Sequence, residues 1–171
     1  MPAHTAIKTA LGVATGLALL TAAPAMAQVT KYQSNPSALI LDGAEVKAGT
    51  DLFFLSGQLA SPVDPKKGFA DVKSVDDLGD TKTQTISALT KIKALLESKG
   101  YTMADLMKLT LFVAADPKLG KMDFAGASEG FKQFFKTTDN PTTVARSTFQ
   151  VAALAGPYFL IEIEGIAAKK K

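Results

Sequence analysis

The sequence predicts an α+β domain in which two helices cover one face of a mixed β-sheet. Segments rich in β-branched and aromatic residues occur towards both ends of the chain, and two segments with helical apolar spacing lie between them. The predicted order is β-β-α-β-α-β-β, which favours a two-layer architecture around one apolar core. A chain of 171 residues is about the length of one domain.

Residues 1–27 are expected to be a secretory signal peptide and not part of the fold. Lys8 gives a positive n-region, residues 10–20 form an apolar run, and Ala25-Met26-Ala27 is a small-residue cleavage motif. The run is too short for a membrane span, which needs about 20 residues. We therefore expect a mature single domain over 28–171, in the bacterial periplasm or secreted, with no membrane attachment after cleavage. An uncleaved N-terminal anchor is the alternative.

The first part of the expected domain contains two strands and a long loop. Residues 28–37 are polar and are expected to be loose. Strands are predicted over 38–46 and 52–56, and the residues 47–50 between them resemble a hairpin turn. Two prolines and two glycines within 60–79 predict a loop.

The first helix is predicted to start near Asp80 or Thr81, either of which can act as its N-cap, and to end at Gly100. A strand is expected over 106–114. The apolar positions of the helix recur at helical spacing. They are Ile86, Leu89, Ile92, Leu95 and Leu96.

The second helix is predicted over 122–136, and its buried stripe would consist mainly of phenylalanines. Gly126 and Gly130 each weaken a helix by about 1 kcal/mol relative to alanine. That cost is tolerable if the glycines let the helix lie close to the sheet. Two further strands are expected over 144–151 and 158–167, paired as neighbours. The sheet face without helices would then need a cover, which oligomerisation supplies most simply.

The residue types that are missing exclude several kinds of chemistry. The chain has no cysteine, and its one histidine, His4, lies in the predicted signal peptide. Ser-His-Asp and Cys-His nucleophile systems are therefore excluded, and a metal site is not expected. We find no Gly-rich nucleotide loop and no basic stripe with interleaved aromatics, so neither a cofactor nor nucleic acid is expected as a partner.

Charged residues occur inside the last two predicted strands. Arg146 lies in the first of them, and Glu162 and Glu164 lie in the second. Charges are unexpected in segments so rich in β-branched and aromatic residues. An arginine beside carboxylates can hold a small anion, but these side chains can equally form an internal ion pair. The residues alone leave both readings open.

Five segments in this order resemble the Rid family of reactive intermediate deaminases. They are residues 54–58 (FLSGQ), 108–113 (KLTLFV), 134–135 (FF), 145–147 (ARS) and 161–167 (IEIEGIA). The resemblance implies a chorismate-mutase-like (RidA-like) fold and a homotrimer with sites at the subunit interfaces. It also implies hydrolysis of 2-imino and enamino acids to 2-keto acids and ammonia, without a cofactor.

The resemblance also implies roles for individual residues. Arg146 would bind the substrate carboxylate, and Glu162 would handle the attacking water. Thr148 falls on the residue whose backbone carbonyl contacts the reacting nitrogen, and Ser56 falls on the family's serine. Ser128 stands where the family has an asparagine.

Two further departures from the family pattern concern the pocket wall. Residues 41–45 lack the family's tyrosine, and Val144 replaces the proline that commonly precedes the A-R-S segment. These departures keep an alternative open, in which the chain is a non-catalytic ligand-binding module or a chaperone-like holdase on the same trimeric scaffold. Ribonuclease activity is a third reading, which the export signal and the missing histidine disfavour.

Overall fold

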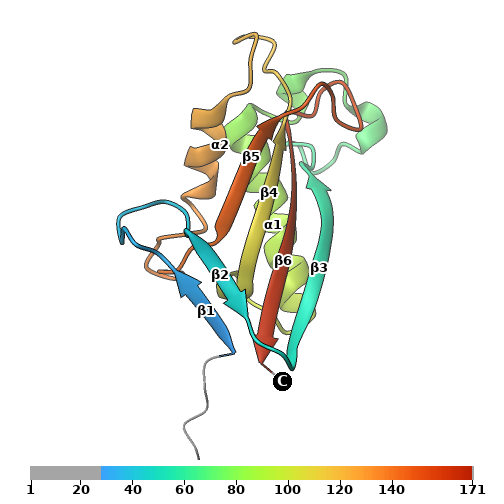
Figure 1. Ribbon diagram of the computed structural model, residues 1–171. Coiled ribbons are helices and arrows are strands. Elements are labelled where there is room, and N and C mark those ends of the chain that lie inside the picture. Colours follow the sequence, from blue (N-terminus) through green and yellow to red (C-terminus); the bar gives the residue numbers. More distant parts are fainter. Residues whose placement is uncertain (1–27, 171) are drawn as a thin grey trace, which may run out of the picture.

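Two helices lie on one side of a four-stranded sheet in the computed structural model, which describes residues 28–170 (Figure 1). The predicted α+β class, with a mixed sheet and helices on one face, is confirmed. The signal peptide predicted for residues 1–27 lies outside the described residues. None of the described helices is long and apolar enough to cross a membrane. The helices are α1 (Thr81–Ser98) and α2 (Phe124–Phe131), with short 3-10 turns at Phe69–Asp71, Val75–Asp77 and Met103–Asp105. The strands are β1 (Val29–Tyr32), β2 (Gly43–Val46), β3 (Thr50–Leu59), β4 (Leu106–Val113), β5 (Ala145–Gln150) and β6 (Ile161–Lys170).

Helix α1 forms as its sequence predicts. The Asp80 side chain accepts a hydrogen bond of 2.8 Å from the backbone N–H of Thr83, which caps the helix. Gly100 follows the helix with φ of 75°, a conformation that glycine adopts without a steric penalty. Leu89, Ile92 and Leu96 are fully buried between the helix and the sheet.

Helix α2 is shorter than predicted, and its glycines serve a different contact. It ends at Phe131 and not at Lys136, because the chain then tightens into turns with a 3.0 Å bond from the N–H of Phe134 to the carbonyl of Phe131. A Cβ atom at Gly130 would lie 2.7 Å from the Cβ of Thr85 on α1. The glycine therefore lets α2 approach α1, and not the sheet as we expected.

The strand order separates β5 from β6, so the predicted pairing of the last two strands is wrong. The order is β3-β6-β4-β5, in which β4 pairs with β6 antiparallel and with β5 parallel. The short connection between β5 and β6 therefore crosses over one strand position. Leu109 of β4 has Arg146 as its register partner on one side and Gly165 on the other.

The N-terminal segment forms a small sheet of its own. Residues 29–32, which we expected to be loose, form β1 and pair antiparallel with β2. The strand predicted over 38–46 shrinks to β2, because the chain bends over residues 39–42, where the N–H of Leu41 bonds to the carbonyl of Val144 at 3.0 Å. The residues 47–50 turn the chain, but β2 and β3 belong to different sheets, so the predicted hairpin is absent.

The two faces of the main sheet differ. Alternate residues such as Leu109, Leu111 and Ile163 face the helices and are fully buried. On the other face, Phe54 and Phe149 are 67% and 54% exposed, so an apolar surface remains uncovered in the single chain. We refer to this second side as the open face.

Candidate functional site

Arg146 lies on β5, at the edge of the sheet, and its side chain is on the side that faces helix α2. The register places it level with the buried Leu109, and its guanidinium carbon lies 4.6 Å from the ring centre of Phe131 and 5.7 Å from that of Phe124. The guanidinium thus lies over two aromatic rings, which attract a cation through their π faces. Ser128 on α2 accepts a long hydrogen bond of 3.4 Å from Nη2 of Arg146.

The guanidinium has hydrogen-bonding capacity that the chain does not use. Its Nη1 is buried and has no hydrogen-bond partner, and no ion pair of the described residues includes Arg146. Burial lowers the pKa of Arg146 from its usual value. Since a guanidinium stays protonated in proteins, a partly buried positive charge remains without a compensating anion. This arrangement is suited to a carboxylate from outside the chain.

Thr148 adds a second buried polar atom that has no hydrogen-bond partner, on the same face of the sheet as Arg146. It stands two residues after Arg146 on the strand and therefore on the same face. Its Oγ1 is buried and has no hydrogen-bond partner. Buried polar atoms in native proteins are normally paired, so unpaired ones that cluster near a positive charge indicate a ligand position. The structure thus brings together Arg146, Thr148 and Ser128.

Glu162 lies on β6, on the open face. Its register partners are Leu59 on β3 and Phe112 on β4. Its carboxylate lies directly against Gly57: a Cβ atom at that glycine would be 1.9 Å from Oε1 and 2.7 Å from the carboxylate carbon. Ser56 and Gly57 form an irregularity in β3, where the ladder skips between Leu55 and Gln58.

Gly57 was not among the site residues that we predicted. The S-G-Q segment was visible in the sequence, but only Ser56 was assigned a role there. The need for glycine appears only when β6 is placed beside β3 and the Glu162 carboxylate fills the space of a missing side chain. Phe124 was interpreted as core packing, but it is 49% exposed beside Arg146.

The internal ion pair that we considered is absent. Arg146 is on the helix side of the sheet, whereas Glu162 and Glu164 are on the open face and β4 lies between the strands. Glu164 is exposed and borders a hollow of about 250 Å³ with Ser56, Lys108 and Thr110. In one chain the predicted site residues therefore form two half-sites: Arg146 with Thr148 and Ser128 on the helix side, and Glu162, beside Gly57, on the open face.

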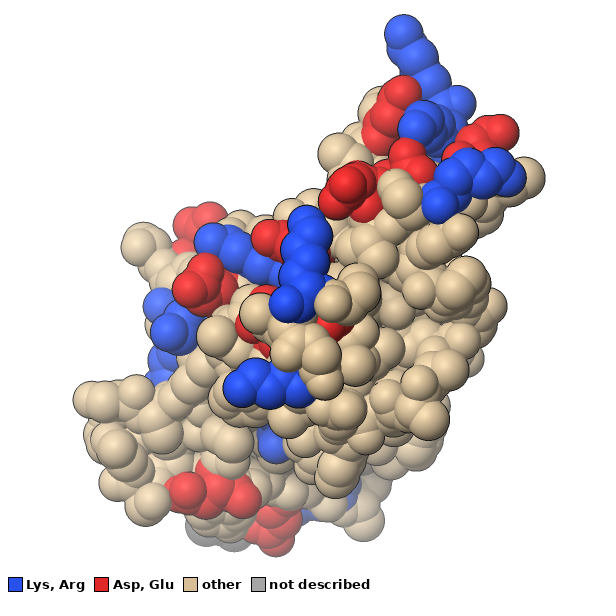
Figure 2. All heavy atoms as spheres, turned by 90° about the horizontal axis from the view of Figure 1, so that it is seen from above, with Lys and Arg blue, Asp and Glu red and all other residues tan. Residues whose placement is uncertain are grey.

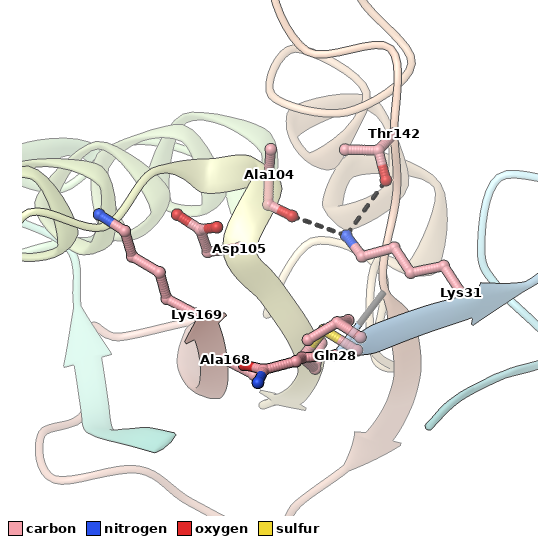
Figure 3. A pocket seen from close by; sticks show the side chains of 9 residues that line it. Gln28, Lys31, Ala104, Asp105, Thr142, Ala168 and Lys169 are labelled. Atoms are coloured by element: carbon pink, nitrogen blue, oxygen red, sulfur yellow. Dashed lines mark hydrogen bonds between the residues drawn. The ribbon is translucent and has the colours of Figure 1, made fainter. Parts of the chain in front are cut away.

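A larger cavity of about 470 Å³ lies under the β1–β2 sheet, and Figure 3 shows it from close by. Lys31 points across it, and its Nζ donates hydrogen bonds to the carbonyl of Ala104 at 2.8 Å, to the carbonyl of Thr143 at 3.0 Å and to Oγ1 of Thr142 at 3.1 Å. These three acceptors use all three hydrogens of the ammonium. We therefore assign Lys31 the role of anchoring β1 to the main domain.

We expect Lys31 to make stability depend on pH. Burial lowers the pKa of this amine to about 8, and the charge of Asp105 opposes that shift. Between pH 8 and the ordinary lysine pKa of about 10.4, the unfolded chain binds more protons than the folded one, so stability rises with pH. After a discount for solvent screening, wild type should gain about 1–2 kcal/mol more than Lys31→Met over this range in urea unfolding. Equal gains in the free energy of unfolding for wild type and Lys31→Met would contradict the lowered pKa of Lys31.

Charges of both signs are interspersed on the face that Figure 2 presents, and many gather on one projecting corner. Ion pairs at the surface include Lys67 with Asp77 at 2.6 Å and Lys118 with Asp76 at 3.7 Å. This face therefore has no continuous basic surface of the kind that tracks a phosphate backbone. Within residues 28–170 no three His, Cys, Asp or Glu side chains form a group suited to a metal ion.

Comparison with known proteins gives consistent results. The profile of the family described as Endoribonuclease L-PSP matches residues 44–169. A RutC family protein of Haemophilus influenzae is 33% identical over 145 residues, which is 85% of this chain and 99% of that protein. A 2-iminobutanoate/2-iminopropanoate deaminase of Salmonella typhimurium is 36% identical over 115 residues, 67% of this chain and 77% of the enzyme.

Solved structures show the same fold. A Yersinia pestis protein, YyfB, described as belonging to the conserved Rid protein family, superposes with a TM-score of 0.60 at 22% identity, covering 82% of this chain and 98% of that one. Escherichia coli TdcF, with bound serine, gives a TM-score of 0.54 at 30% identity, covering 82% of this chain and all of TdcF (100%).

Proposed function

The Endoribonuclease L-PSP profile over residues 44–169 and the relatives named as 2-iminobutanoate/2-iminopropanoate deaminases place this chain in the Rid family, and we propose that it is a deaminase that hydrolyses 2-imino and enamino acids to 2-keto acids and ammonia. The observation that carries the proposal is the buried Nη1 of Arg146, which has no partner and no neighbouring carboxylate. Curated relatives that are 33–36% identical are named 2-iminobutanoate/2-iminopropanoate deaminase, and TdcF binds serine, a small molecule with a carboxylate.

Arg146 binds and orients the substrate in this proposal. The planar guanidinium matches a carboxylate through two parallel hydrogen bonds, and Thr148 and Ser128 add polar contacts beside it. A fixed carboxylate sets the position of the adjacent imine carbon, which removes much of the entropic part of the barrier.

Glu162 handles the water. Its carboxylate accepts a proton as the water oxygen bonds to the imine carbon, and the nitrogen takes up a proton to give a carbinolamine. Glu162 then accepts the hydroxyl proton and passes a proton to the amino nitrogen, the C–N bond breaks, and ammonia leaves as the keto group forms. Acid–base catalysis of this kind contributes about 10²–10⁴-fold in rate. Ser56 precedes Gly57 in the chain and borders the hollow beside Glu164, which makes it a further candidate for substrate contact.

The site is completed between two copies of the chain. In one chain the two half-sites lie on opposite sides of the sheet, so Arg146 and Glu162 cannot contact one molecule as small as an imino acid. The open face exposes Phe54 and Phe149, which suits an interface. We therefore propose a homotrimer in which the Arg146 half-site of one copy meets the Glu162 half-site of the next around a closed ring.

Mixing two inactive variants tests both the reaction and this assembly. Arg146→Ala and Glu162→Gln should each release ammonia from freshly generated 2-iminopropanoate at about the uncatalysed rate. Oligomers refolded from an equal mixture should recover about a quarter of wild-type activity, because one interface in four then pairs an intact Arg146 with an intact Glu162. Light scattering gives the mass of each assembly.

Two outcomes would contradict the proposal. Wild-type protein that releases ammonia no faster than buffer would end the deaminase assignment. Inactive variants that stay inactive when mixed, although their mass is that of a trimer, would show that the two half-sites do not meet across an interface.

A further inference from the structure

An apolar cavity of about 420 Å³ lies at the end of β3, whose last residue, Leu59, is the register partner of Glu162. Its walls come from three parts of the chain: the last residue of β3, the turn that begins at Phe69, and the segment between β5 and β6. The side chains that line it include Leu59, Phe69, Val72, Pro157, Tyr158 and Phe159. None of these residues carries a charge, and no family motif discussed above assigns them a role.

The cavity is close to the proposed water-handling carboxylate. Leu59, which forms part of its wall, is the direct register partner of Glu162 on the neighbouring strand. Side chains of such partners are on the same face of the sheet, with their Cβ atoms about 5 Å apart. A molecule whose reacting carbon is positioned beside Glu162 can therefore extend a side chain into the cavity.

Polar contacts hold the walls in place. The buried Gln84 of α1 donates to the carbonyl of Tyr158 at 3.1 Å and accepts from the N–H of Leu160 at 2.8 Å, which fixes the segment before β6. Lys91 donates to the carbonyl of Leu59 at 3.0 Å. The rings of Phe69 and Phe159 meet with their centres 6.2 Å apart. The cavity is thus formed before a ligand arrives, as is usual for small-molecule sites.

We propose that this cavity takes the side chain of the substrate, so that imino acids with branched or aromatic side chains react faster than 2-iminopropanoate, whose side chain is a methyl group. The inference rests on the proposed function and specifies its substrate class. With the carboxylate on Arg146 and the water beside Glu162, the side chain is the remaining substituent of the imine carbon. Each methylene buried in an apolar pocket raises specificity by about 10–200-fold.

Competing substrates test this preference. An amino acid oxidase generates imines from alanine, leucine and phenylalanine in the presence of the mature protein, and the rate of 2-keto acid formation is measured against the uncatalysed rate. We expect kcat/KM for the leucine- and phenylalanine-derived imines to exceed that of the alanine-derived imine by about 10-fold or more. Val72→Phe, which fills the cavity, should remove this preference by lowering kcat/KM for the leucine- and phenylalanine-derived imines to about the value for the alanine-derived imine.

A matched control separates the cavity from the loop that forms it. Val63→Phe makes the same chemical change in the same loop, at a side chain that is 58% exposed and does not line the cavity, and it should keep the wild-type preference. A wild-type preference for the alanine-derived imine, or a preference that Val72→Phe leaves intact, overturns this inference and leaves the deaminase proposal standing. Failure of wild type to hydrolyse any of the three imines overturns both.

Discussion

Arg146→Ala is expected to lower kcat/KM for imino acid hydrolysis by about 10²- to 10⁴-fold. Each hydrogen bond to a charged group contributes about 1.5–3 kcal/mol, and the variant loses the two that a carboxylate would accept from the guanidinium. The measurement is the initial rate of ammonia release from freshly generated 2-iminopropanoate. The variant loses the long hydrogen bond to Ser128 and the contacts with the rings of Phe124 and Phe131, but no ion pair of the described residues, so the free energy of unfolding should fall by only about 1–2 kcal/mol.

Lys132→Ala is the matched control for charge. Lys132 directly follows α2 and is exposed, so its removal takes away one positive charge near the site without altering the guanidinium. It should retain wild-type kcat/KM. Arg146→Lys should stay well below wild type, since an ammonium keeps the charge but has no planar fork. Equal rates for wild type and Arg146→Ala would remove the proposed role and favour the ligand-binding or holdase alternative, in which suppression of client aggregation survives the substitution.

Gly57→Ala is expected to lower kcat by about 10²-fold or more through its effect on Glu162. The added Cβ would lie 1.9 Å from Oε1 of Glu162 and 2.7 Å from the carboxylate carbon, so the carboxylate must swing away. The nearest atoms belong to the end of a flexible side chain and not to backbone, so the fold accommodates the methyl group by moving that side chain. The substitution thus displaces one carboxylate while the protein stays folded.

Gly43→Ala is the control for this substitution. Its Cβ would have no heavy atom within 4 Å, so kcat should equal that of wild type. The double variant Gly57→Ala/Glu162→Gln should be no slower than Glu162→Gln alone, because both changes remove the same function. If Gly57→Ala kept the wild-type kcat while Glu162→Gln was slow, the Glu162 carboxylate would have to act from a position other than the one beside Gly57.

Local patterns in the sequence predicted the elements that depend on local physics. The apolar spacing and the cap at Asp80 identified α1, whose hydrogen bonds all form within one segment. Residues 29–32 were missed because a short polar strand has no strong pattern and is stabilised mainly by pairing with β2. The length of α2 was overestimated because the apolar stripe continues through Phe134 and Phe135, which pack on the core from turns and not from a helix.

The sequence by itself determined the fold class, through its apolar periods and turn residues, and it identified the charged residues that the family resemblance connects with imine chemistry. Only the tertiary structure decided that β4 separates β5 from β6 and that Arg146 and Glu162 are on opposite sides of the sheet. It also decided that Gly57 makes room for a carboxylate. The physical reason is that periodicity and capping act over a few neighbouring residues, whereas strand order and register are set by contacts between segments far apart in the chain.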